Sequence, residues 1–193
     1  LLRKALEKAG YGYVPVISFS LNNLEDHPGF KLTLPILHRM VYGVMFGDLL
    51  LSLVNQCKPY ELNHGDTERL AEKYTVELAK EMQENGVSFR KAKQRYKEIL
   101  DAFAQIPMAD EEKVRVGIVG EIYVKYSPLG NNNLEQFLVD EGAEVTIPGF
   151  LDFCLYCVYN NLIDYKFYRK RKLAYPVIKR VYQYLLGKQR ELI

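Results

Sequence analysis

Residues 114–150 constrain the fold most, because they read as one strand–helix–strand unit. Residues 114–120 form a short run rich in β-branched side chains, which favours a buried parallel strand. Apolar side chains then recur at helical spacing in residues 134–138, and residues 144–147 supply the next short apolar run. The sequence therefore predicts a β-α-β unit with two parallel strands.

The helix inside this unit carries predicted start and stop signals. Asn133 stands at the N-cap position, and Gln136 follows three residues later, where its side chain would bond back as a capping box. Gly142 provides the residue that ends the helix.

The polar loop at residues 120–133 is the predicted ligand site, because ligands of open α/β sheets bind beyond the carboxyl ends of the strands. A glycine there lets a ligand approach closely, and the carboxylate and amides supply hydrogen-bonding groups. The loop has neither a dinucleotide fingerprint nor a phosphate-binding loop, and a capped, solvated loop stays the alternative. The candidate ligand-binding residues are Gly120, Glu121, Asn131, Asn132, Asn133 and, from the loop after a further candidate strand, Asn22.

The rest of the chain is predicted to be mostly helical. A further strand is expected at residues 14–19, followed by helices at 34–56, 66–86 and 88–103. These patterns predict an α/β fold with a parallel sheet of few strands. In that fold, residues 34–107 would be a large helical insertion in a lobe of residues 1–164, and residues 165–193 would be a helical extension.

The most apolar stretch, residues 32–54, is predicted to be a buried central helix. His38, Arg39 and Asp48 interrupt it, which leaves no charge-free run of the ~18 residues that a membrane span needs. We therefore expect no membrane partner. A charged helix at residues 1–10 lacks the apolar core of a signal peptide, and we expect a cytoplasmic protein.

Three cysteines do not make a disulfide framework or a complete zinc site. Cys154 and Cys157 have a two-residue gap, but no second pair accompanies them. Buried structural thiols are the ordinary interpretation, and one thiolate given to a shared iron–sulfur site is the alternative. The histidines are scattered and form no catalytic set by spacing.

The tail after residue 165 interleaves basic residues with tyrosines. Such a pattern suits RNA or a phosphate-bearing ligand, or else a solvated helix whose tyrosines pack inward. The whole chain has a formal net charge of only +2, so we expect nucleic acid not to be a partner.

Several separated segments resemble one family, the 2-hydroxyacyl-CoA dehydratase superfamily, and most closely its large activase-related proteins (CoA-substrate-specific enzyme activases). The segments span about residues 2–157 and are VPVISFSLNN, GFKLTLPILHRMVYGVMFGDLL, KPYELNHGDTE and VRVGIVGEIYVKYSPLGNNNLEQFLVDEGAEVTIPGFLDFCLYC.

The resemblance implies a Rossmann-like α/β lobe of an iron–sulfur protein in anaerobic metabolism. Relatives hold a [4Fe-4S] or double-cubane cluster between lobes, and an ATP-driven activator passes electrons to it. Cys157 matches the family-like phrase and is the implied metal ligand, whereas Cys154 and Cys57 are incidental.

The chain also begins without Met, so we expect it to be part of a longer parent protein, whose missing lobes and possible activator ATPase are the implied partners. The isolated chain is then expected to hold no cofactor and to act as a non-autonomous domain. Two alternatives stay open: a module that binds a CoA-like or phosphate-bearing molecule, and an interaction scaffold that docks a partner through the basic tail.

Overall fold

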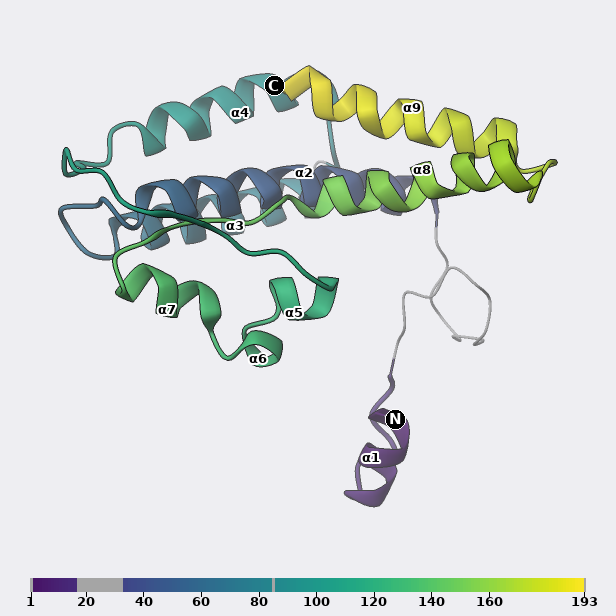
Figure 1. Cartoon of the computed structure of the whole chain (residues 1–193), viewed down its shortest axis with the longest axis horizontal. Coiled ribbons are helices and arrows are strands. Elements are labelled where there is room, and N and C mark those ends of the chain that lie inside the picture. The colour runs from purple at the N-terminus through teal and green to yellow at the C-terminus, as the bar shows by residue number, and fades with distance from the viewer. Residues whose placement is uncertain (1, 17–32, 85, 193) are drawn as a thin grey trace. The chain divides into compact units, whose positions relative to one another are not determined.

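The computed structural model describes residues 2–16, 33–84 and 86–192, with side chains described as far as residue 190 (Figure 1). The chain divides into two units, residues 1–34 and 35–193. The first unit contains α1 (Leu2–Lys8), which ends where Gly10 adopts a left-handed backbone with φ of 82°.

The second unit is built mainly from five long helices. They are α2 (Leu34–Cys57), α3 (Asp66–Glu84), α4 (Phe89–Phe103), α8 (Phe150–Tyr168) and α9 (Tyr175–Leu192). Between α4 and α8 lie the small elements β1 (Arg115–Gly117), α5 (Ile122–Tyr126), α6 (Pro128–Asn131), α7 (Leu134–Asp140) and β2 (Glu144–Thr146). Figure 1 shows α5, α6 and α7 gathered on one side of the long helices.

The apolar helix α2 belongs to two core clusters. Tyr42 and Phe46 pack with side chains from α3 and α4, and their rings lie 4.5 Å apart between centroids. Met45 instead faces Leu151, Leu155 and their neighbours on α8 and α9. Because α2 is apolar around most of its surface, it can bury opposite faces against different helices.

Length and composition alone would also let α2 cross a membrane, and it is the one helix in the described part of the chain that passes this test. This is weak evidence, because core helices of soluble proteins pass the same test.

The predicted β-α-β unit is confirmed locally. Strands β1 and β2 are parallel, with Arg115 opposite Glu144 and Val116 opposite Val145. The helix predicted between them is α7, and Gly142 follows it with φ of 83°, a left-handed conformation typical of a helix end.

The predicted Rossmann-like α/β fold is wrong. The structure is 67% helix and 5% strand, and its sheet has two strands in the described residues. Residues 34–107 are therefore not an insertion in a sheet, because their helices form the core themselves. Of the strand expected at 14–19, residues 14–16 are not extended into a strand, and 17–19 lie outside the described residues.

The seven-residue strand expected at residues 114–120 shows why the predicted sheet does not form. Val114 and Val119 are exposed, and the residues that lie in register with β2 are 115–117. A β-branched run fits a buried strand only where other elements cover it, so its composition alone does not fix how many strands exist.

Candidate functional site

The loop after β1 folds into two short capped helices. Oε2 of Glu121 accepts hydrogen bonds from the backbone N–H groups of Tyr123 (2.9 Å) and Val124 (3.3 Å), and so caps α5. Oγ of Ser127 accepts from the N–H of Gly130 at 3.3 Å and caps α6. The capped-loop alternative therefore describes this part of the candidate site well.

The three asparagines form the turn between α6 and α7. Asn132 and Asn133 both have left-handed backbones, with φ of 55° and 56°, a conformation that asparagine tolerates better than most residues. Oδ1 of Asn131 accepts from the first N–H of α7 at 3.2 Å. The predicted capping box is wrong, because Asn133 makes no side-chain cap bond and Gln136 donates to Asp140 instead.

Asn131 and Asn133 line a cavity of about 220 Å³ between this loop, the end of α2 and the start of α3. Nζ of Lys58 enters it and donates hydrogen bonds to Glu68 and to Gln136, both at 2.6 Å. The full lining is Val54, Asn55, Lys58, Glu68, Tyr126, Pro128, Asn131, Asn133, Glu135, Gln136 and Val139.

The structure thus brings two of the six candidate residues to one cavity. Gly120, Glu121 and Asn132 are not part of its lining. Gly120 itself is exposed, with φ of 148°. Asn22 lies outside the described residues.

A second polar site joins α2 to α8. Oδ1 of Asp48 accepts from the N–H of Phe150 (2.7 Å), and Oδ2 accepts from the N–H of Leu151 (2.8 Å). One carboxylate of α2 therefore caps the N-terminus of a helix 102 residues later in the chain. Burial raises the pKa of Asp48, although the two N–H donors partly oppose this shift.

A cavity of about 260 Å³ lies beside Asp48. Tyr96 from α4 lines it, and burial together with the nearby Asp48 raises the pKa of Tyr96 to about 12. Burial and the same carboxylate raise the pKa of Tyr126 to about 12, and the Tyr126 hydroxyl donates to the backbone oxygen of Pro148. Sequence reasoning noted Asp48 only as a charge in an apolar run, which was the available signal for a special role.

The cysteines occupy three different environments. Cys57 is buried in the cluster of α2, α3 and α4, whereas Cys154 is half-buried against the cluster of α2, α8 and α9. Burial, and then the neighbouring Cys157, raise the pKa of the Cys154 thiol. Cys157 is exposed one helical turn later, between Tyr156 (61% exposed) and Tyr159 (46% exposed). No group of three or more His, Cys, Asp or Glu suited to a metal occurs within the described residues.

The segment KPYELNHGDTE serves to position α3. The carboxylate of Glu61 accepts from the N–H of Gly65 (2.6 Å) and the N–H of Thr67 (2.8 Å). Burial alone would raise the pKa of Glu61, but the donors outweigh it and the pKa is lowered. The backbone of Glu61 also forms an isolated antiparallel bridge with Met108, which ties this segment to the chain after α4.

The same segment reaches the small sheet. The hydroxyl of Tyr60 donates to Oε2 of Glu144 at 2.7 Å, and Nε of Arg115 donates to the same oxygen at 3.1 Å. Glu144 is buried, so these donors compensate for the loss of water around its charge.

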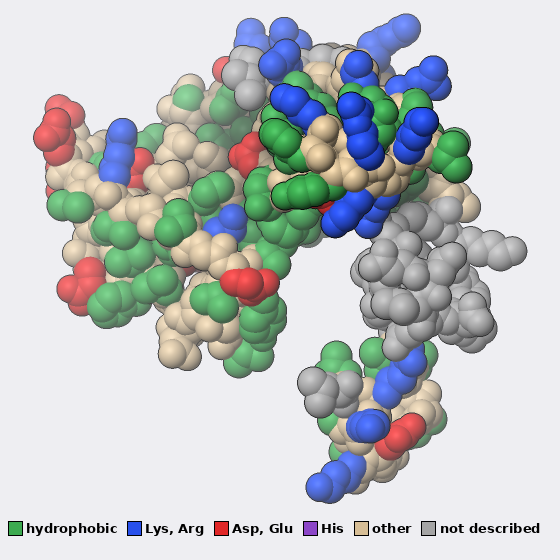
Figure 2. Space-filling view, turned by 45° about the vertical axis from the view of Figure 1, so that its right-hand side comes forward, with side chains coloured by type: hydrophobic (Ala, Val, Ile, Leu, Met, Phe, Trp, Pro, Cys, Tyr) green, Lys and Arg blue, Asp and Glu red, His purple; other side chains and the backbone are tan. Residues whose placement is uncertain are grey.

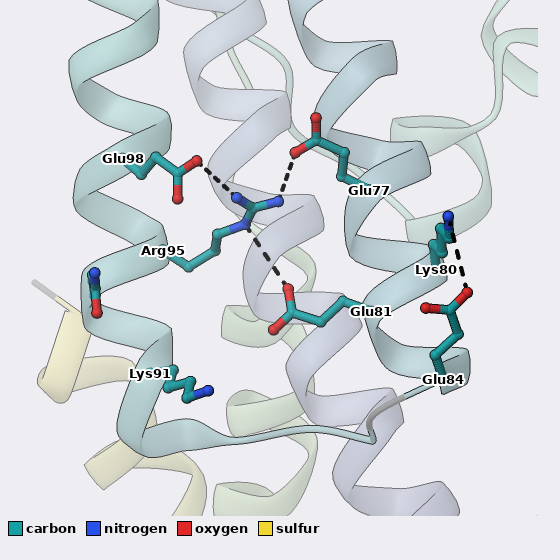
Figure 3. Close-up of a pocket in the computed structure, with 8 residues that line it drawn as sticks. Glu77, Lys80, Glu81, Glu84, Lys91, Arg95 and Glu98 are labelled. Atoms are coloured by element: carbon teal, nitrogen blue, oxygen red, sulfur yellow. Dashed lines mark hydrogen bonds and ion pairs between the residues drawn. The ribbon is translucent and has the colours of Figure 1, made fainter.

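The cavity drawn in Figure 3, of about 500 Å³, contains an arginine clamp between α3 and α4. Arg95 donates to Glu77 at 2.7 Å and to Glu98 at 2.8 Å, and its Nε lies 3.9 Å from Glu81. The carboxylates already neutralise this arginine, so the cluster holds two helices together.

Comparison with known proteins adds no relative: no family model matches the chain, and neither a curated protein nor a solved structure resembles it significantly.

Proposed function

We propose that the chain is a non-autonomous domain of a larger cytoplasmic iron–sulfur protein related to the 2-hydroxyacyl-CoA dehydratases and their activase-related proteins. Its role would be to pack against the other lobes of that parent protein and to give them one thiolate. The segments quoted above carry the resemblance, and the exposed thiol of Cys157 is the structural observation that supports this role.

The surroundings of Cys157 favour a docking face over an isolated surface thiol. Tyr156 and Tyr159 expose large rings beside it on α8. Adjoining exposed apolar side chains mark surfaces that another protein covers. Because tyrosine combines a large apolar ring with a polar hydroxyl, it is enriched at such interfaces.

The residues described do not fit a complete cluster. A [4Fe-4S] cluster is usually held by four thiolates, and the chain has three cysteines, of which Cys57 lies in a separate core cluster. Cys154 packs into the other core cluster, which leaves Cys157 as the accessible ligand. The remaining ligands would come from the parent protein, and an activator ATPase would be the electron donor to that assembly.

Iron and sulfide counts on the anaerobically purified parent protein test this proposal. We expect Cys157→Ala to lower the iron content and Cys57→Ala to leave it unchanged, because Cys157 is exposed whereas Cys57 is buried. Cys154→Ala is the matched control from the same helix. Wild-type iron content in the Cys157→Ala protein would overturn the ligand assignment.

A small-ligand role for the cavity lined by Asn131 and Asn133 is a second candidate function. Its charged lining is one ammonium group, on Lys58, against two carboxylates, on Glu68 and Glu135. That balance favours a polar or cationic ligand over one that carries phosphate. Thermal-shift measurements with spermidine and with coenzyme A would separate the two chemistries, with Asn133→Ala as the variant expected to weaken spermidine binding.

A further inference from the structure

The turn between α8 and α9 carries a concentrated positive charge that the net charge of the whole chain conceals. Residues 165–190 contain nine Lys and Arg and no Asp or Glu. The whole chain has 26 basic and 24 acidic residues, so the rest has 17 basic and 24 acidic residues, a net charge of −7 against +9. Figure 2 shows the basic side chains gathered over one part of the surface. Five of them lie at the turn itself and are exposed: Lys166, Arg169, Lys170, Arg171 and Lys172.

Exposed apolar side chains share this turn with the cations. Leu173 is 96% exposed, and Phe167 and Tyr168 are 67% and 69% exposed. Nζ of Lys166 lies 5.5 Å from the ring centroid of Phe167, and Nζ of Lys170 lies 5.4 Å from that of Tyr168. The turn thus presents apolar groups and positive charges together, a combination found in proteins that bind the surface of anionic membranes.

The backbone holds these side chains in a fixed turn. The rings of Tyr165 and Tyr175 stack across it with centroids 4.1 Å apart. Arg169 and Arg171 both have left-handed backbones, with φ of 54° and 56°, where glycine or asparagine fits more easily. Arginine is less favourable than glycine or asparagine in this left-handed backbone conformation, but it places two more cations at the turn.

We propose that this α8–α9 turn (residues 166–173) docks the protein onto an anionic membrane surface. The five cations would bind lipid phosphates, and Leu173 and Phe167 would enter the headgroup region. An exposed leucine has no partner in the charged backbone of a nucleic acid, whereas a lipid interface gives it an apolar environment. The proposal is independent of the iron–sulfur role of Cys157.

This inference replaces the expectation of no membrane partner. That expectation rested on the charges that interrupt residues 32–54, which bear on a membrane span and not on surface binding. The net charge of +2, which was weighed only against a nucleic-acid partner, averages the basic turn with acidic surfaces elsewhere.

Co-sedimentation of the 193-residue chain with vesicles tests the proposal. We expect binding to phosphatidylcholine vesicles that contain phosphatidylserine, no binding without it, and loss of binding at high salt. Each basic residue near such a surface contributes about fivefold in affinity, so replacing four of them should weaken binding by about 100-fold or more. The test variant combines Arg169→Gln, Lys170→Gln, Arg171→Gln and Lys172→Gln.

A second quadruple variant controls for net charge alone. It combines Arg90→Gln, Lys91→Gln, Lys93→Gln and Lys97→Gln, all exposed positions of α4. We expect it to keep nearly wild-type binding. Equal losses in both variants, or no binding of the wild-type chain to anionic vesicles, would overturn the proposal.

Insertion of the apolar side chains has its own readout. The chain contains no tryptophan, so Leu173→Trp introduces a single reporter at the turn. Its fluorescence should shift to the blue with anionic vesicles, whereas Val76→Trp, an exposed position on α3, should not shift. An unshifted Leu173→Trp spectrum, or tighter binding to a single-stranded RNA oligonucleotide than to vesicles, would count against a lipid surface.

Discussion

Gly149 leaves room for the carboxylate of Asp48: a β-carbon at position 149 would lie 2.7 Å from Oδ2 of Asp48. Because two N–H bonds hold that carboxylate, it cannot simply rotate away. We expect Gly149→Ala to lower the free energy of unfolding by about 1–3 kcal/mol. Urea denaturation followed by circular dichroism measures this loss.

A glycine with open space around it provides the control. Gly47 lies inside α2, and a β-carbon there would meet no atom within 4 Å. Gly47→Ala should therefore stabilise the protein by about 0.5–1 kcal/mol through helix propensity. If both variants lose the same stability, the close contact between Gly149 and Asp48 is not the cause.

Removing the Asp48 carboxylate should destabilise the attachment of α8 to α2. Asp48→Ala leaves two N–H groups of α8 without their acceptor, and the expected loss is about 0.5–2 kcal/mol. The more exposed Asp152, in the first turn of α8, provides a matched control. We expect Asp152→Ala to cost less, and a larger cost than that of Asp48→Ala would contradict the cap.

Asp48 and Glu61 should respond to pH with opposite signs. The pKa of Asp48 is raised above its ordinary value of 3.8, so its contribution to stability is present below that pH and is lost as pH rises through the folded-state pKa. The pKa of Glu61 is lowered from 4.5, so its contribution is present above 4.5 and is lost as pH falls through the folded-state pKa.

Two amide variants make this difference measurable. Between neutral and acid pH, the stability deficit of Glu61→Gln should shrink, whereas that of Asp48→Asn should grow. Melting temperatures across this range, each compared with wild type at the same pH, give both trends. Parallel trends for the two variants would show that one assigned shift has the wrong direction.

Because of the arginine clamp, we expect replacement of Arg95 to cost much more stability than replacement of Lys80, another cation of the same cavity. Arg95→Met removes the partner of Glu77 and Glu98 and should cost about 1–3 kcal/mol in the free energy of unfolding. Lys80 lies on the exposed surface, 4.0 Å from Glu84, and Lys80→Met should change stability by less than about 0.5 kcal/mol. Comparable losses would mean that the clamp does not hold α3 and α4 together.

Thiol labelling distinguishes the three cysteines. The exposed Cys157 should react with a thiol reagent at neutral pH before the other two. Burial raises the pKa of both Cys57 and Cys154, which lowers their reactive thiolate fraction. Mass spectrometry after brief labelling locates the modified residue, and first labelling at Cys57 would contradict the structure.

Local signals in the sequence predicted the helices well. The helix predicted at residues 34–56 is α2, which ends one residue later, at Cys57. The helix predicted from residue 88 is α4, with Ser88 at its N-cap position. The β-α-β segment also gave two parallel strands. The prediction of the fold class was wrong because a strand-like composition does not specify which strands pair with it. The sheet in the described residues has two strands, and the helices form the core.

The candidate site was only partly predictable for a related reason. Asn131 and Asn133 are local turn residues, and they reached the same cavity because one short turn places them together. The pairing of Asp48 with the start of α8 joins positions 102 residues apart, and no local pattern encodes such a contact. Net charge likewise gave no sign of the basic turn, because it sums over surfaces that folding separates.

The uneven distribution of charge also has a consequence for chromatography. A sulfonate resin meets a segment of nine basic residues without a single acid, and a quaternary-ammonium resin meets a remainder with seven more acids than bases. At neutral pH the protein should therefore be retained by both kinds of ion exchanger, although a net charge of +2 on a uniform surface predicts weak retention by the first alone. The sulfonate resin would bind the basic segment and the quaternary-ammonium resin would bind acidic residues elsewhere. The two salt concentrations at which the protein elutes would therefore report on two separate surfaces.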